Sequence, residues 1–564
     1  MHAGIVGTGP AAEAFRAACA DVDATVSDTN PADLGDVDFG AVVAPAGAAA
    51  FDAADDAAGR WVAVEIGGLG GHAVPDLDAA VSVFDADSAG YADLRARMAA
   101  TRDGPGEASA TGDRSAVRLA GAVAGRRMVA LLAGADVGGT VVEVPGDERA
   151  FLPVPDSSDR DRTLRRDYRD VSLDDSLERA ERGFDERVGL LDQVGERESF
   201  PVPYYLAGTA DTTGFSDARA AAFAAGVDVD WDRAFMKALG EGLERYSAGV
   251  YRRAEFVVAP EKNRARPVSP REFVRPDTYR PPDVEERVPW VDGEDVQTGE
   301  TVSLPAEFVH YPPPDERHKP AITTGLGLGN SGVEALLAGL YEVVERDATM
   351  LSWYSTYDPL GLAVDDDGFD ALVARARAEE LSVTPLLVTQ DVDVPVVAVA
   401  VHREGDWPRF AVGSGADLDA AGAARSALAE ALQNWMELRS MGPDAAAEEE
   451  GAIGAYADFP DPARAFVDAS SRVPAGSVGP DPVPSGEAEL AALLDGLDAA
   501  GLSAYAARLT PSDVERLGFE AVRALVPAAQ PLFTGEPFFG ERAEAVPREL
   551  GYEPRPDRPF HPYP

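Results

Sequence analysis

The chain has 564 residues, 45% of them hydrophobic and 26% charged, and this length predicts two or three domains rather than one core. A net charge of −48 with only three lysines predicts adaptation to molar salt, and the lack of a basic patch excludes nucleic acid as a partner. A single cysteine, Cys19, excludes a disulfide framework, and the absence of a long apolar run or a signal start predicts a cytoplasmic protein without a membrane partner.

The first hundred residues have the pattern of a small parallel α/β domain. A short apolar strand precedes Gly7 and Gly9, a helical stretch follows, and Ala12 takes the third position of a dinucleotide-binding fingerprint. Asp28 follows a second short strand at the spacing of a ribose contact. Further strand-like runs lie at 39–44 and 61–66. The pattern predicts a Rossmann-like fold and leaves an NAD-dependent oxidoreductase as a competing interpretation.

The next segments connect this domain to the rest of the chain. Residues 101–114 are rich in Gly, Ser, Asp and Thr, which is typical of a linker. Residues 116–132 have helical periodicity, and residues 140–144 and 150–154 are strand-like. A charged stretch then leads into a helix predicted over residues 176–194.

The sequence therefore divides into three parts. We expect a Rossmann-like α/β domain at 1–155, an acidic helical linker at 156–200 and a larger domain of mixed α+β character at 201–564. No internal repeat of fixed period is present.

Three predicted helices of the larger domain, at 233–247, 330–353 and 424–439, hold charged residues among Ala, Leu, Val and Gly. In the second helix, at about 100° per residue, three carboxylates share one side with an amide: Asn330, Glu334, Glu342 and Glu345. Buried carboxylates repel one another unless a cation neutralises them, and arginine suits phosphate oxygens. The pattern indicates Mg²⁺ and a nucleotide, without a GxxxxGK[ST] loop. For any single glutamate, a solvated surface position is the alternative.

These residues resemble the three nucleotide-binding signatures of the YcaO family. The signatures read Glu241-x-x-Glu244-Arg245, then Asn330-x-x-x-Glu334 with Glu342-x-x-Glu345-Arg346-Asp347, then Arg425 to Gln433. The N-terminal part resembles the ThiF-type, ubiquitin-activating-like partner domain of azole-forming enzymes. The chain end, Phe560 to Pro564, resembles the proline-rich tail of YcaO cyclodehydratases.

The resemblance implies an enzyme that binds ATP and Mg²⁺ and phosphorylates a peptide-bond oxygen. The product would be an azoline ring or a thioamide in a ribosomally made peptide or protein, as in bacteriocin biosynthesis. The partners implied are this substrate, a sulfur-donor or peptide-presenting protein, and a second copy in a homodimer. A non-catalytic YcaO-like scaffold is the other alternative.

Residue roles follow from the same resemblance. The implied Mg²⁺ ligands are Glu241, Glu244, Glu334, Glu342 and Glu345. The implied nucleotide contacts are Asn330, Arg346, Arg425 and Gln433, with Lys237 as a replacement phosphate contact and Arg245 ordering the carboxylates. In the tail, Pro562 and Pro564 are implied catalytic residues, because the tail end would position or provide the base.

The chain departs from the family pattern in four places. Ala225-Gly226-Val227 replaces a Gly-Lys-Gly loop, and Lys237 stands where serine is usual. The stretch 153–158 lacks the cysteines of a zinc tetrad, so we expect no zinc. The chain begins at its first strand, so we expect no winged-helix peptide clamp.

Overall fold

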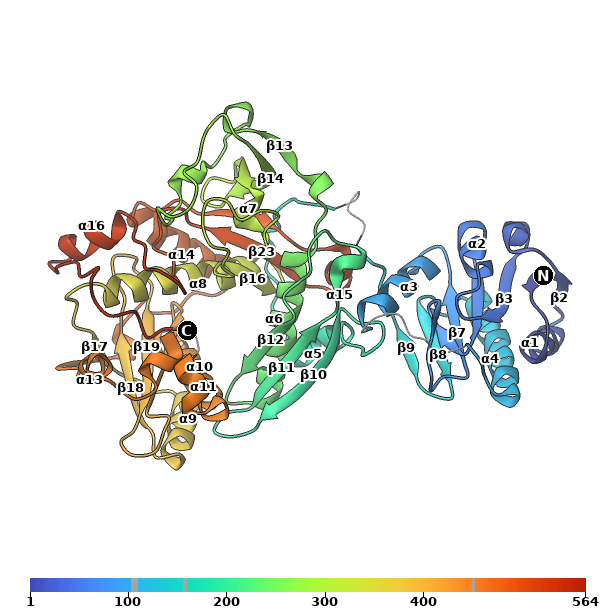
Figure 1. Cartoon of the computed structure of the whole chain (residues 1–564), viewed down its shortest axis with the longest axis horizontal. Coiled ribbons are helices and arrows are strands. Elements are labelled where there is room, and N and C mark those ends of the chain that lie inside the picture. The colour runs from blue at the N-terminus through green and yellow to red at the C-terminus, as the bar shows by residue number, and fades with distance from the viewer. Residues whose placement is uncertain (103–109, 156–159, 449–451) are drawn as a thin grey trace. The chain divides into compact units, whose positions relative to one another are not determined.

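The computed structural model describes residues 1–102, 110–155, 160–448 and 452–564. These form two compact units (Figure 1). Unit 1 comprises Met1–Asp156, Glu181–Gln193 and Gly208–Ala222, and unit 2 comprises Ser157–Ala180, Val194–Ala207 and Phe223–Pro564. Among the described residues, no helix has both the length and the apolar character needed to cross a bilayer.

Unit 1 is built on a seven-stranded sheet in the order β2-β1-β3-β4-β7-β8-β9. The first four strands are parallel, and β7, β8 and β9 continue the sheet antiparallel. The strands are β1 (His2–Val6), β2 (Thr25–Asp28), β3 (Phe39–Pro45), β4 (Trp61–Ile66), β7 (Ala79–Phe84), β8 (Thr140–Val144) and β9 (Glu148–Ala150). A small separate hairpin consists of β5 (Gly68–Leu69) and β6 (His72–Ala73).

Helices cover both faces of this sheet, because alternate strand residues point to opposite sides. On one face, α1 (Pro10–Ala20) and α4 (Arg114–Leu132) bury Phe15 and Ala120 against Ile5. On the other, α2 (Ala50–Ala57), α3 (Tyr91–Ala100) and the 3₁₀ turn η1 (Pro31–Asp36) bury Phe51 and Leu94. The predicted α/β class is confirmed, with a sheet that is parallel only in its first half.

The fingerprint glycines shape the turn after β1. Gly7 has φ +109°, and a Cβ there would lie 2.2 Å from the carbonyl oxygen of Val43, so only glycine fits. Asp28 is exposed and forms an ion pair with Arg16 of α1. The aspartate predicted to contact a ribose thus has a partner within the protein.

Unit 2 contains two larger sheets. The first has the order β13-β14-β22-β23-β16, with β15 also on β14, and is antiparallel throughout. The second has the order β20-β19-β18-β17-β21 and is antiparallel except for β17 with β21. A further sheet, in the order β10-β11-β12, has three strands, with most but not all of its residues in unit 2, since β10 begins and β11 ends in unit 1. The strands are β10 (Leu191–Glu198), β11 (Tyr204–Thr209), β12 (Phe223–Val227), β13 (Val257–Pro260), β14 (Arg287–Asp295), β15 (Thr301–Pro305), β16 (Leu326–Gly329), β17 (Leu360–Ala363), β18 (Ser382–Leu387), β19 (Val396–His402), β20 (Phe410–Ala416), β21 (Arg472–Pro474), β22 (Tyr505–Arg508) and β23 (Glu520–Leu525).

The helices of unit 2 place the predicted signatures between these sheets. Helix α8 packs on β16 and β23 of one sheet and on β19 and β20 of the other, while α6 packs on β12 and β16 and α10 on β19 and β20. The helices are α5 (Leu173–Glu181), α6 (Trp231–Gly249), α7 (Ala306–Val309), α8 (Gly332–Trp353), α9 (Asp367–Ala378), α10 (Ala420–Met441), α11 (Pro443–Glu448), α12 (Ala452–Tyr456), α13 (Asp461–Val467), α14 (Glu487–Ala499), α15 (Ser512–Leu517) and α16 (Arg542–Glu549).

Each of the three signature helices begins with a capping side chain. Asp230 accepts from a backbone N–H of the first turn of α6, Ser331 does so for α8 and Asp419 for α10. Such caps satisfy backbone donors that have no partner within the helix. The caps fix where each helix starts, and therefore which turn carries each glutamate.

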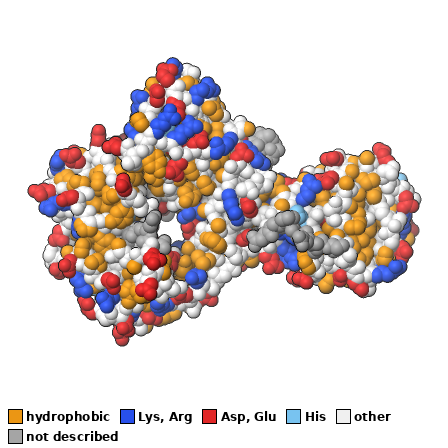
Figure 2. Space-filling model, viewed as in Figure 1, with side chains coloured by type: hydrophobic (Ala, Val, Ile, Leu, Met, Phe, Trp, Pro, Cys, Tyr) orange, Lys and Arg blue, Asp and Glu red, His pale blue; other side chains and the backbone are white. Residues whose placement is uncertain are grey.

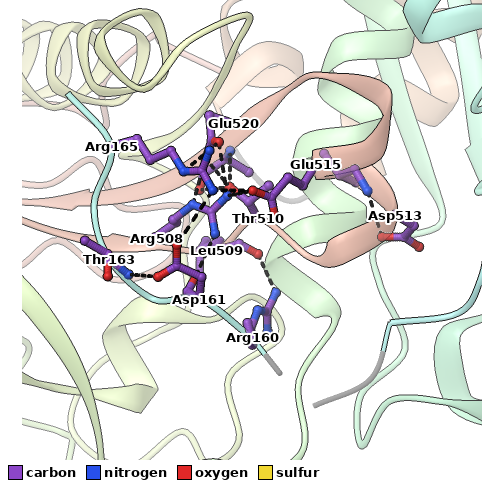
Figure 3. A network of polar contacts seen from close by, with 12 residues as sticks. Arg160, Asp161, Thr163, Arg165, Arg508, Leu509, Thr510, Asp513, Glu515 and Glu520 are labelled. Carbon is purple, nitrogen blue, oxygen red and sulfur yellow. Dashed lines mark hydrogen bonds and ion pairs between the residues drawn. The ribbon is translucent and has the colours of Figure 1, made fainter. Parts of the chain in front are cut away.

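An arginine-rich extended segment precedes α5 and is fastened to unit 2 (Figure 3). Arg160 donates to the carbonyl oxygens of Val250, at 2.7 Å, and Leu509. The buried Arg508 donates to the Asp161 carbonyl oxygen at 2.6 Å and pairs with Glu520 through two contacts of 2.8 and 3.0 Å. The segment therefore gives α5 a fixed position on unit 2.

Several predicted elements match and two do not. The strand at 61–66 and the helix at 116–132 are confirmed as β4 and α4. The helix predicted over 176–194 is wrong, because α5 ends at Glu181 and β10 starts at Leu191. Between them, a Cβ on Gly189 would lie 2.4 Å from the Asp185 amide nitrogen, so this tight turn requires glycine.

Smaller differences concern the connecting segments. The strand predicted at 150–154 is wrong, since β9 ends at Ala150. Of the predicted linker 101–114, residues 103–109 lie outside the described residues, as do residues 156–158 of the stretch compared with a zinc tetrad.

Candidate active site

Helix α6 contributes two partly buried glutamates and an arginine. Glu241 accepts hydrogen bonds from the Ala225 amide at 3.0 Å and from Arg245 at 2.7 Å, and Arg245 lies 4.0 Å from Glu244. The pKa of Glu244 is raised to about 8. The main cause is burial, and the charges of Glu241 and Glu342 also contribute to the rise. The glutamates of α6 and α8 are thus close enough to repel each other.

Helix α8 contributes Glu342 and Glu345 to the same region. Glu342 accepts from the Gly325 amide at 3.0 Å, and Glu345 accepts from the Ser414 hydroxyl at 2.7 Å. Arg346 lies 3.5 Å from Glu345. Burial raises the pKa of Glu345, while the charge of Arg346 opposes the rise. A carboxylate in this setting is stabilised by any further positive charge.

Helix α10 adds a glutamate that the residue roles above leave out. Glu430 accepts from the Ser414 amide at 2.7 Å and lies 4.0 Å from Arg346. Burial raises its pKa to about 7, Arg346 lowers it and the charge of Glu345 raises it. The sequence feature that could have identified Glu430 is its position among Ala and Leu in the third predicted helix, between Arg425 and Gln433.

We define the carboxylate cluster as Glu241, Glu244, Glu342, Glu345 and Glu430. Its members come from three helices, and the charge of Glu342 raises the pKa values of the other four. The structure thus brings together four of the five predicted Mg²⁺ ligands, with one additional glutamate.

Glu334 lies at the start of α8 and pairs with Asn330. Its Oε2 atom accepts from the Asn330 amide nitrogen at 2.7 Å and from Asn330 Nδ2 at 3.2 Å. The Ser176 hydroxyl of α5 donates to Asn330 Oδ1 at 3.0 Å. A carboxylate on one side and a hydroxyl donor on the other therefore fix the orientation of this amide. Ser176 has no sequence signal, since it lies 154 residues before Asn330.

Three predicted nucleotide contacts are paired with nearby carboxylates outside the cluster. Lys237 lies 2.7 Å from Asp228, Arg425 donates to Asp366 at 2.7 Å, and Gln433 donates to Glu437 at 2.9 Å. Their assignment as nucleotide contacts remains a prediction.

The proline-rich tail is fastened to the end of α8. Trp353 donates from Nε1 to the Pro559 carbonyl oxygen at 2.8 Å, and the Arg558 guanidinium lies 4.1 Å from the centre of the Trp353 ring system. His561 is buried, with Nε2 2.8 Å from the Phe533 carbonyl oxygen. These contacts hold the tail in one path across α8.

The tail end lies inside unit 2 (Figure 1). Tyr563 is 1% exposed, Pro562 is buried and Pro564 is partly buried. Burial raises the pKa of Tyr563, Arg558 lowers it and the charge of Glu345 raises it. Tyr563, between the two predicted tail residues, is thus within electrostatic range of Glu345, and the catalytic role of Pro562 and Pro564 stays a prediction.

The chemistry of the cluster fits Mg²⁺ and ATP. Its donors are carboxylate oxygens, which Mg²⁺ prefers, and their raised pKa values show that burial disfavours their charge in the absence of a cation. Arg346 Nη1 lies 3.5 Å from Glu345 Oε1 but forms no hydrogen bond, so this guanidinium still has donors for a phosphate oxygen. Within the described part of the chain, no three Asp, Glu, His or Cys side chains form a compact metal-ligand group.

Fold and cluster together define a class of protein: an α/β protein whose helical glutamates and arginines have the chemistry that suits Mg²⁺ and a nucleotide. Residues 225–530 match the YcaO cyclodehydratase family, which is ATP- and Mg²⁺-binding. The match includes 306 of the 564 residues and all three signature helices. The chain belongs to the YcaO family, as its signatures predicted, and ATP and Mg²⁺ are its cofactors.

Two curated proteins are similar over shorter lengths. An uncharacterized protein of Methanothermobacter thermautotrophicus is 30% identical over 207 residues, which are 35% of this chain and 53% of that protein. An uncharacterized protein in the tfuA 3′ region of Rhizobium leguminosarum bv. trifolii is 28% identical over 168 residues, 26% of this chain and 39% of that protein. The chain thus spans about half or less of the curated relatives it matches.

Solved structures share the fold. A heterocyclase in complex with substrate and cofactor has a TM-score of 0.73 at 16% identity and covers 98% of this chain and 83% of its own. The heterocyclase TruD has a TM-score of 0.67 at 16% identity, with coverages of 98% and 81%. YcaO from Methanopyrus kandleri, bound with AMPPCP and Mg²⁺, has a TM-score of 0.54 at 23% identity, with coverages of 68% and 99%. The first two include a counterpart of the N-terminal unit.

Proposed function

We propose that this chain is a cytoplasmic peptide cyclodehydratase that uses ATP to remove a backbone amide oxygen. A Cys, Ser or Thr side chain of the substrate attacks the preceding carbonyl carbon. The amide oxygen accepts the γ-phosphoryl group of ATP, the carbon–oxygen bond breaks, and the products are an azoline ring, ADP and phosphate. The observation that carries the proposal is the carboxylate cluster on three helices within the matched region.

The residues then take the following roles. Glu241, Glu244, Glu342 and Glu345 hold Mg²⁺, together with Glu334 at the start of α8, and we add Glu430 to this set. Asn330, Arg346, Arg425, Gln433 and Lys237 contact the nucleotide, and Arg245 orders the glutamates of α6. The bound Mg²⁺ neutralises the charge of the phosphates. Arg346 supports the transferring group from the protein side, because its Nη1 atom forms no hydrogen bond and only a 3.5 Å ion pair with Glu345.

The tail supports the reacting amide. Pro562 and Pro564 bring the end of the chain beside Glu345, and the buried ring of Tyr563 excludes water there. We propose that the tail end positions the substrate amide and the group that removes the proton of the nucleophile. The N-terminal unit presents the peptide, since the heterocyclase folds include the same unit.

The decisive experiment compares wild type with Glu345→Gln in molar KCl. The substitution keeps the side-chain volume and removes one metal-ligand charge. We expect ATP turnover to fall about 100-fold or more, the range seen when one preorganised electrostatic group is removed from an active site, with the circular-dichroism spectrum unchanged. Asp28→Asn in unit 1 is the matched control and should keep the wild-type rate.

The product is read by mass spectrometry of a Cys-containing peptide. Loss of one water indicates an azoline, whereas exchange of one oxygen for sulfur in the presence of a sulfide donor indicates a thioamide. Wild-type turnover by Glu345→Gln would refute the metal assignment. ATP hydrolysis that no peptide stimulates would refute the cyclodehydratase proposal.

A further inference from the structure

A small cavity lies against α8 on the side next to the carboxylate cluster. Its volume is about 40 Å³, which suffices for a few water molecules or one small anion but not for a nucleotide or peptide. The residues that matter for its chemistry are Phe273, Lys319, Thr324, Arg346, Arg523 and Gln530. Three of these six carry a positive charge, and the cavity has no carboxylate in its lining.

Arg523 is a rigid part of this cavity. It is 3% exposed, and its Nη1 and Nη2 atoms donate to the carbonyl oxygens of Thr323 and Ile322, both at 2.9 Å. Its Nε atom is buried without a hydrogen-bond partner, whereas Nη1 of Arg346 forms no hydrogen bond but lies 3.5 Å from Glu345 Oε1. A buried guanidinium donor without a partner is costly, so Arg523 Nε is available to an acceptor that enters from the cavity.

Lys319 completes the positive lining. Its ammonium group lies 5.4 Å from the ring centre of Phe308 and 5.9 Å from that of Phe273. The nearby carboxylate, Glu307, accepts from the backbone and ring nitrogens of His318 at 2.6 and 2.8 Å and from the Arg317 amide at 2.7 Å. Glu307 is therefore already engaged, and aromatic faces are weak partners for a buried cation.

The electrostatics agree with this geometry. The pKa of Lys319 is lowered to about 7, mainly by burial and in part by the charge of Arg523. Two cations that disfavour each other in a buried place are stabilised when an anion binds between them. An anion in the cavity would therefore restore the full charge of Lys319.

The cavity and the carboxylate cluster are connected through the two arginines. Arg346 lies 3.5 Å from Glu345, and the charge of Arg523 interacts with those of Glu342 and Glu244. On α8, Glu342 and Arg346 are four residues apart and so lie on adjacent turns of one face. Any group transferred at the cluster thus has a cationic cavity beside it.

We propose that Lys319, Arg346 and Arg523 form a phosphate-oxyanion site that receives the phosphate released from the substrate. Three cations from three separate elements suit a tetrahedral anion, whose oxygens point in different directions, better than a planar carboxylate. The inference rests on the proposed function: when the carbon–oxygen bond of the phosphorylated amide breaks, the bonding electrons and the oxygen leave with phosphorus as inorganic phosphate. Neutralising this leaving group favours ring formation.

The test measures binding of inorganic phosphate to the full chain by isothermal calorimetry, with saturating ADP and Mg²⁺ in molar KCl. We expect saturable phosphate binding by wild type, weakened about tenfold or more in Lys319→Met, since one charged hydrogen bond is worth about 1.5–3 kcal/mol. Lys262→Met is the matched control, because Lys262 pairs with Glu285 on the surface. It should bind phosphate like wild type.

Competition in the wild type provides a test that needs no variant. Sulfate should displace phosphate, whereas acetate at the same concentration should not. Retention of wild-type affinity by Lys319→Met, equal displacement by acetate, or loss of phosphate binding when ADP is present would each overturn the proposal. Binding of phosphate is measured without turnover, so its failure is distinct from a failure of the cyclodehydratase assignment.

Discussion

Individual carboxylates in this chain owe their properties to burial more than to their local sequence. Glu244 and Glu430 have pKa values raised to about 8 and about 7, and in both the leading cause is burial of the carboxyl group away from solvent. Glu437, also on α10, accepts hydrogen bonds from Tyr204 and Gln433 at 2.8 and 2.9 Å. Glutamates on one helix thus divide between the carboxylate cluster and ordinary structural pairing.

Asp417 offers a test of this burial effect away from the cluster. Its pKa is raised to about 6, mainly by burial and in part by the charges of Glu489 and Asp419. The folded state therefore binds the proton more tightly than the unfolded chain, whose aspartate titrates near 3.9. Stability from this group is present at low pH and is lost as pH rises through about 6.

We expect Asp417→Asn to stabilise the fold by about 1–3 kcal/mol at pH 7.5 and to have no effect below about pH 4. The asparagine oxygen can still accept from the Asp419 amide, which lies 2.7 Å away in the wild type. Denaturant melts of both proteins at the two pH values measure the difference. A stabilisation that is the same at both values would contradict the assignment.

Helices and their attached segments decide which side chains meet. Helix α5 is held by the segment that Figure 3 shows, and it positions Ser176 against Asn330 at 3.0 Å. This contact comes from outside the region that matches the family. The position of Asn330, a predicted nucleotide contact, is thus fixed in part by chain that precedes the matched domain.

The tail is the second such element. It crosses the end of α8, where Trp353 donates to Pro559, and it buries Tyr563 beside Glu345. Deletion of Pro562–Pro564 should reduce peptide modification about 100-fold or more, the scale of losing a positioned catalytic group. ATP-analogue binding should stay within about threefold, because the helical glutamates are untouched.

Calorimetry with AMPPCP and Mg²⁺ and mass spectrometry of the peptide separate these two effects. The control is substitution of the exposed Glu553 by Gln, because it leaves the path of the tail intact. Deletion of Arg548–Leu550 at the end of the surface helix would shift the tail and is not suitable. Full modification by the truncated protein would remove the tail from the mechanism.

Charge acts over the full length of the chain. Acidic side chains are spread over the visible face of both units, interspersed with Arg and Lys (Figure 2). A net charge of −48 destabilises the compact state through self-repulsion unless salt screens it. The cytoplasm of a halophile is the setting that we propose for this protein.

A pair of thermal melts tests this setting. We expect the melting temperature to fall by more than about 10 °C between about 3 M and about 0.1 M KCl, because the Debye length grows from below 3 Å to about 10 Å. Circular dichroism follows the melt, and an equal concentration of sucrose controls for osmotic effects. Equal melting temperatures at the two salt concentrations would contradict halophilic adaptation.

The sequence alone was enough for the signatures and the helices that carry them. Periodicity within a helix is local, so residues 233–247, 330–353 and 424–439 already indicated the three helices with their buried glutamates. The spacing of Glu342, Glu345 and Arg346 on one helix also carried the family and its cofactors.

Contacts between distant segments could only come from the folded chain. Ser176 meets Asn330 across 154 residues, and the cavity joins Lys319, Arg346 and Arg523 from a loop, a helix and a strand. The end of α5 at Glu181 likewise depends on the turn around Gly189, where no side chain fits. Such features depend on packing and on which groups lose their water, and periodicity along a single segment contains no information about either.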